Sequence, residues 1–160
     1  MNPQFGTERA VAEWLASTLD DPDRAHGAWA IHRVAALPLG REFCVIRLSR
    51  ELVEAATSST DPSTISDVLA ESLDGPVICD PVCHRYYALV PPTGAAPWPA
   101  TKGAEWVGEG TVVGIPEVGG MAPQLITYWS VPFVSRHELC DPGLIRDLVL
   151  VGEKRLAASL

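Results

Sequence analysis

The chain has 160 residues, of which 47% are hydrophobic and 20% are charged, and its formal net charge is −8. This length and composition predict one folded domain spanning residues 1–160 and exclude a disordered segment. The negative charge and the scattered basic residues argue against direct binding to nucleic acid or to an anionic membrane surface.

The N-terminal segment has no basic stretch followed by an apolar core, and no run of the sequence approaches the ~20 apolar residues that a membrane span needs. We therefore expect a protein of the cytoplasm that has no signal peptide and no contact with membranes. In that compartment the cysteines are expected to be reduced thiols; they are Cys44, Cys79, Cys83 and Cys140.

The first half of the chain predicts helices alternating with strands. Pro22 is expected to end the first helix, because proline has no N–H for the helical ladder. Serine, threonine and aspartate are common N-caps, and proline is favoured at the first helical position. The predicted elements are, in chain order, a helix capped by Thr7, strands over 29–37 and 43–48, a short helix capped by Ser49, and a helix that Asp61 and Pro62 open and Gly75 ends.

The second half predicts mainly strands and turns. Its predicted elements are strands over 76–79, 85–90, 105–107, 111–115 and 125–131, then a helix opened by Asp141 and Pro142. The expected fold class is α+β, with a single mixed or mainly antiparallel sheet and helices packed mostly on one of its faces.

Cysteine and histidine residues could form a zinc site. Cys79, Cys83 and His84 form one cluster in the sequence, and His137 and Cys140 form another. Neither cluster has the close C-x2-C spacing of common zinc sites, and Cys79 and Cys140 each follow apolar residues that favour the core. We therefore expect no metal and no cofactor, with Cys79, Cys83, His137 and Cys140 as the alternative ligand set.

No motif predicts catalytic residues. The sequence has no G-x-S-x-G nucleophile motif, and the glycines of residues 108–114 precede a strand pattern, whereas a phosphate-binding loop opens a helix. Asp21 and Asp23 form a D-x-D pair, but they lie at a predicted helix end and turn, where a capping role is expected.

The loop over residues 91–103 has the composition of a binding surface. Prolines flank Trp98 within it, and Trp106 follows it. Proline stiffens a loop and tryptophan offers a large contact area. The residues expected to bind a partner are Trp98, Trp106, Pro97 and Pro99. The alternative is that both indoles cover one end of the sheet.

Several short segments between Gly40 and Gly152 follow one another in a familiar order. They are residues 40–43, 45–48, 74–78, 87–92, 108–111, 115–116 and 129–132. In this order the chain resembles small actinobacterial proteins and the bifunctional primase/polymerase N-terminal domain family. The second resemblance implies a nucleotidyl-transferase fold with carboxylate-bound magnesium or manganese. No predicted strand carries the acidic pair, so the resemblance implies the fold without its catalytic residues.

These observations predict a non-catalytic protein-interaction or regulatory protein whose partner is another protein. The alternative is a nucleotide-handling enzyme of primase/polymerase-like fold with a degenerate or unrecognised metal site. Self-association into a homo-oligomer is compatible with either function.

Overall fold

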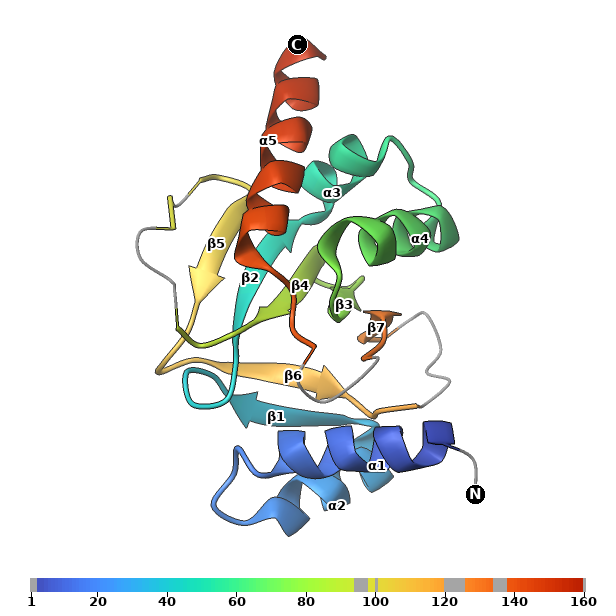
Figure 1. Cartoon of the computed structure of the whole chain (residues 1–160), viewed down its shortest axis with the longest axis vertical. Coiled ribbons are helices and arrows are strands. Elements are labelled where there is room, and N and C mark those ends of the chain that lie inside the picture. Colours follow the sequence, from blue (N-terminus) through green and yellow to red (C-terminus); the bar gives the residue numbers. More distant parts are fainter. Residues whose placement is uncertain (1–2, 94–97, 100, 120–125, 134–137, 160) are drawn as a thin grey trace.

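The structure is a computed structural model, and it describes residues 3–93, 98–99, 101–119, 126–133 and 138–159 (Figure 1). Its elements are, in chain order, α1 (Pro3–Ala16), α2 (Pro22–His32), β1 (Val34–Pro38), β2 (Cys44–Ser49), α3 (Arg50–Thr57), α4 (Pro62–Leu73), β3 (Val77–Asp80), β4 (Arg85–Val90), β5 (Ala104–Val107), β6 (Val112–Pro116), β7 (Tyr128–Val131) and α5 (Pro142–Ala158). The predicted α+β class is confirmed. Within the described ranges, no helix combines the length and hydrophobicity of a membrane span.

The described strands form two antiparallel sheets. One has the order β5-β2-β4-β3-β7, and the other pairs β1 with β6. The chain passes from the small sheet to the larger one at the turn between β1 and β2, and back again at the turn between β5 and β6; Gly40 and Gly110 in these turns have φ angles of 103° and 93°. The turns touch, because a Cβ on Gly40 would lie 2.8 Å from the Cα of Glu109. These adjoining turns let β1 and β6 form a separate small sheet.

Each face of the five-stranded sheet has its own core. In β2, Ile46 and Leu48 belong to the helix-side core beneath α3, α4 and α5, whereas Val45 belongs to the inter-sheet core toward β1 and β6. Ala88 and Leu89 of β4 divide in the same way. This division follows from the alternation of side chains along a strand. Figure 1 shows α1 and α2 beyond the small sheet, at the opposite end of the molecule from α3 and α5.

The prediction of a strand over residues 29–37 is wrong in its first part, because Trp29 to His32 belong to α2. Asp21 is the N-cap of this helix, and its side chain accepts a hydrogen bond from the backbone N–H of Asp23. Pro22 therefore begins a helix instead of ending one. Aspartate followed by proline opens α4 and α5 in the same manner. The D-x-D pair thus lies at a helix start, where Asp21 has the predicted capping role.

Three tryptophans around the inter-sheet core connect different parts of the fold through indole hydrogen bonds. The indole N–H of Trp29 donates to the carbonyl of Ile115 at 2.9 Å, across 86 positions of sequence. Trp129 donates to the carbonyls of Pro116 and Glu117, both at 3.2 Å. Trp14 donates to the carboxylate of Glu42 at 3.1 Å. Each bond joins the indole to a segment that is distant in sequence.

Helix α5 packs closely on α3. A Cβ on Gly152 would lie 2.6 Å from the Cδ1 of Leu52, so glycine permits this approach. Nearby, the guanidinium of Arg155 donates to the carbonyl oxygens of Ala55 and Ala56, at 3.1 and 2.7 Å. Carbonyls at a helix C-terminus lack partners within the helix, so Arg155 caps α3.

Candidate functional site

The structure brings the predicted residues Trp98 and Trp106 together at one edge of the five-stranded sheet. Trp106 lies on β5, opposite Ile46 of β2. Its ring centroid is 6.5 Å from that of Trp98, and the ring planes are inclined by 49°. Both indoles are half-buried and pack against the helix-side core, and Pro99 is exposed. Pro97 lies outside the described residues. The pair therefore combines core packing with surface exposure.

The two indole N–H groups differ in their partners. Trp106 has a side-chain hydrogen bond with Cys44, whose thiol pKa is raised by burial and lowered in part by this bond. The Nε1 atom of Trp98 is buried, and no described residue accepts its hydrogen bond. An unpaired buried donor costs about 1–3 kcal/mol of folding free energy. The position of Trp98 is therefore less favourable than that of a fully bonded core tryptophan.

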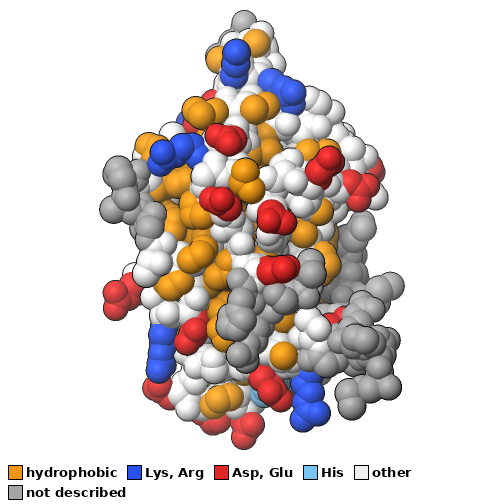
Figure 2. All heavy atoms as spheres, viewed as in Figure 1, with side chains coloured by type: hydrophobic (Ala, Val, Ile, Leu, Met, Phe, Trp, Pro, Cys, Tyr) orange, Lys and Arg blue, Asp and Glu red, His pale blue; other side chains and the backbone are white. Residues whose placement is uncertain are grey.

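Helix α5 extends this aromatic pair into a larger surface. The guanidinium carbon of Arg146 lies 5.6 Å from the ring centroid of Trp98, within the range of a cation–π contact. Leu150 follows one helical turn later and is 57% exposed. Figure 2 shows hydrophobic side chains gathered between α5 and β5. We call the surface formed by Trp98, Trp106, Arg146 and Leu150 the Trp98 surface.

The cysteines of the alternative zinc set lie in different surroundings. Cys79 is buried on β3, whereas Cys83 is exposed in the β3–β4 turn. The thiol of Cys140 is buried and donates to the carbonyl of Pro76 at 3.3 Å. His137 lies outside the described residues. Among the residues that the structure does describe, no three metal-binding side chains form a group, and the four thiols are free.

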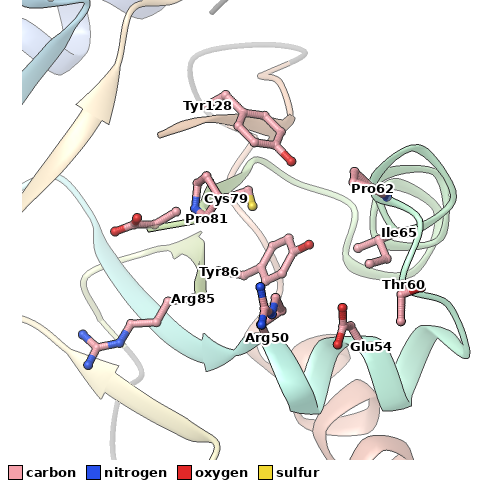
Figure 3. Close-up of a pocket in the computed structure, with 11 residues that line it drawn as sticks. Arg50, Glu54, Thr60, Pro62, Ile65, Cys79, Pro81, Arg85, Tyr86 and Tyr128 are labelled. Carbon is pink, nitrogen blue, oxygen red and sulfur yellow. The ribbon is translucent and has the colours of Figure 1, made fainter. Parts of the chain in front are cut away.

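A pocket that the sequence did not predict lies around Cys79 (Figure 3). Its volume is about 160 Å³, and α3, α4, β3, β4 and β7 contribute to its lining. We call it the Cys79 pocket. Its lining residues used below are Arg50, Glu54, Pro62, Ile65, Cys79, Tyr86 and Tyr128. Because these come from separate segments, no local motif marks them as a group. The one sequence signal is the spacing of Arg50 and Glu54, which places both on one side of a helix.

Neutral polar groups form the inner end of the Cys79 pocket. The hydroxyls of Tyr86 and Tyr128 hydrogen-bond with the side chain of Cys79. Burial is the main cause of the raised pKa of the thiol and of both hydroxyls. All three groups therefore stay protonated at neutral pH, and they offer hydrogen bonds without charge.

Four charged side chains line the Cys79 pocket: Arg50 and Glu54 of α3, Asp80 of β3 and Arg85 of β4. Figure 3 shows Arg85 pointing away from the space in front of Cys79. Arg50 and Glu54 lie one turn apart, yet no described residue forms an ion pair or hydrogen bond with either side chain. Arginine preceding glutamate is the less favourable order for such a helical pair. Both charges are therefore available to a bound molecule.

A second pocket, of about 230 Å³, opens between the two sheets. Arg47 and Arg85 line it together with Tyr87 and Thr111. The guanidinium of Arg47 is paired with the carboxylate of Glu105 at 2.6 Å. Arginine is well suited to bind phosphate or carboxylate groups, so Arg85 offers this pocket a positive charge for an anion, although Asp80 adds a negative charge to the same lining.

Comparison with protein-family models, with curated proteins and with solved structures finds no match to the chain. Its function is therefore inferred from its own side chains and surfaces.

Proposed function

We propose that this protein is a non-catalytic interaction or regulatory protein of the cytoplasm, and that it binds another protein through the Trp98 surface. The observation that carries the proposal is the buried indole N–H of Trp98, which no described residue accepts, on a surface that α5 extends with the exposed side chain of Leu150. Tryptophan and arginine are enriched among residues that dominate interface energies, and Arg146 covers the same indole.

The side chains of the Trp98 surface indicate which chemical groups the partner presents to it. The partner is expected to present an apolar side chain to Leu150 and a hydrogen-bond acceptor to Trp98. Because the Trp98 N–H is covered in the free protein, the indole must shift to reach that acceptor. Pairing the N–H removes the cost of the unmade bond, so the shift is favourable in the complex.

The test compares one disruptive variant with a matched control. Leu150→Glu places a charge in the Trp98 surface, whereas Ile31→Glu places it at another exposed apolar position, 76% exposed on α2. A protein recovered from cells with the wild-type chain is identified, purified and titrated against each variant. We expect Leu150→Glu to raise the dissociation constant by about 30-fold and Ile31→Glu to leave it unchanged.

Trp98→Phe gives a second readout, because it removes only the N–H and part of the ring. The partner should quench or shift the tryptophan fluorescence of the wild type, and this component should be lost in Trp98→Phe. Equal affinity of the wild type, Leu150→Glu and Trp98→Phe for the partner would exclude the Trp98 surface as the binding site.

The second candidate function is nucleotide handling, and the arginines of the inter-sheet pocket favour it. Arg47 and Arg85 could hold the phosphates of a nucleotide there. Thermal melting with and without ATP and magnesium tests this candidate, since a ligand that binds the folded state raises the melting temperature. A rise that is lost in Arg85→Gln would support it, and an unchanged melting temperature would count against it.

A further inference from the structure

We propose that the Cys79 pocket binds a free α-amino acid with a small apolar side chain. The pocket shares no residue with the Trp98 surface. The proposal therefore stands independently of the proposed function.

The size of the pocket sets the size of the ligand. Its volume is about 160 Å³. A cavity of roughly 150 Å³ accepts a molecule as large as benzene, whereas drug-sized ligands fill roughly 300–1,000 Å³. A nucleotide is too large for this space, and an aliphatic amino acid is close to the size that it holds.

The charges of the pocket favour a ligand that carries both signs. The guanidinium of Arg50 suits a carboxylate, and the carboxylate of Glu54 suits an ammonium group. A simple anion would leave the charge of Glu54 unpaired beside it, and a simple cation would do the same for Arg50. An α-amino acid satisfies both side chains, which have no other ionic partner among the described residues.

The uncharged residues that line the pocket also suit an amino acid with an apolar side chain. Figure 3 shows the hydroxyls of Tyr86 and Tyr128 and the carboxylate of Glu54 pointing into the space in front of Cys79. The tyrosine oxygens can accept hydrogen bonds from an ammonium group. Pro62 and Ile65 of α4 line the opposite side, where they offer an apolar contact for the side chain of the ligand.

Calorimetric titration of the full chain tests the proposal with defined probes. The probes are glycine, L-valine and L-leucine, with two analogues of valine. 2-Methylpropylamine is valine without its carboxylate, and 3-methylbutanoate is valine without its amino group. We expect L-valine or L-leucine to bind more tightly than glycine, and both analogues to bind at least about tenfold more weakly than L-valine, because each lacks one charge-assisted bond.

Matched variants on one helix locate the ligand. Glu54→Gln and Arg50→Gln should each weaken binding of the preferred amino acid by roughly ten- to a hundredfold. Glu51→Gln is the control, because Glu51 is exposed on α3 and does not line the pocket. Melting curves verify that each variant is folded, and the comparison of analogues on the wild type needs no variant.

Three results would overturn the proposal. They are the absence of binding by all three amino acids, equal binding of L-valine and either of its analogues, and equal affinity of Glu54→Gln and Glu51→Gln for the amino acid. Loss of partner binding through the Trp98 surface would leave the proposal standing, so the two ideas fail separately.

Discussion

The tryptophans around the inter-sheet core and those at the edge of the five-stranded sheet have different roles. Trp14, Trp29 and Trp129 each donate an indole hydrogen bond to a distant segment. At the sheet edge, Trp106 is bonded to Cys44, and Trp98 alone has a buried N–H without a described acceptor. The first group joins layers of the fold, whereas the Trp98 N–H has no acceptor in the part of the chain that the structure describes. We therefore expect the first group to be required for folding, whereas the proposed function requires Trp98 to be available for binding.

The largest loss of stability is expected from truncating Trp29, one of the tryptophans that bond to a distant segment. Trp29→Ala removes a buried indole and its bond to Ile115. It should lower the free energy of unfolding by about 3–5 kcal/mol, because large core truncations leave cavities. Urea denaturation followed by circular dichroism measures the change. A loss below about 1 kcal/mol would place Trp29 outside the group that holds the fold together.

Phenylalanine substitutions test the hydrogen bonds themselves. Trp29→Phe removes the indole N–H that donates to the carbonyl of Ile115 and should cost about 1–3 kcal/mol. Trp98→Phe removes an N–H that no described residue accepts, so it should change stability by less than about 1 kcal/mol. The two variants are compared by urea denaturation under identical conditions. Equal losses of unfolding free energy in the two variants would contradict the distinction between the tryptophans around the inter-sheet core and Trp98.

The helix-side core should lose stability at alkaline pH through Cys140. Burial raises the pKa of this thiol from 9.0 to about 12. Between these values the unfolded chain has released the proton while the folded chain keeps it, so stability falls as pH rises. The thiol should contribute a loss of about 1 kcal/mol between pH 9 and 10. Cys140→Ala should remove that part of the slope, and an unchanged slope would contradict the prediction.

The smallest effect is expected on the exposed side of α5. Leu150→Ala should change the free energy of unfolding by no more than about 0.5 kcal/mol, because the side chain is exposed and supports little of the core. Leu148→Ala is the control, since Leu148 is buried in the helix-side core. A large loss in Leu150→Ala would mean that the Trp98 surface is a structural part of the fold.

Local signals in the sequence predicted local structure well. The strand predicted over 85–90 coincides with β4, and Ser49, Asp61 and Asp141 cap the helices that they were expected to cap. Helix α2 was missed because Pro22 was interpreted as the end of a helix, although aspartate precedes it as it precedes the prolines of α4 and α5.

Features that depend on distant segments could not be predicted. The division into two sheets depends on contact between the turns at Gly40 and Glu109. The Cys79 pocket depends on several elements that meet only in the folded chain. Trp98 and Trp106 were predicted as binding residues, which the structure does not test; their rings lie 6.5 Å apart, and the partners of their N–H groups were not predictable.

Because Arg155 caps α3 from the far end of the chain, α3 is synthesised long before the residue that caps it. Arg155 bonds to Ala55 across 100 positions of the chain. At ribosomal rates of about 5–20 residues per second, α3 emerges roughly 5–20 seconds before its capping side chain. During that interval the side of α3 that later receives Gly152, formed by Leu52 and Ala56, is uncovered. The nascent chain therefore exposes an apolar helix face that chaperones can bind until α5 leaves the ribosome.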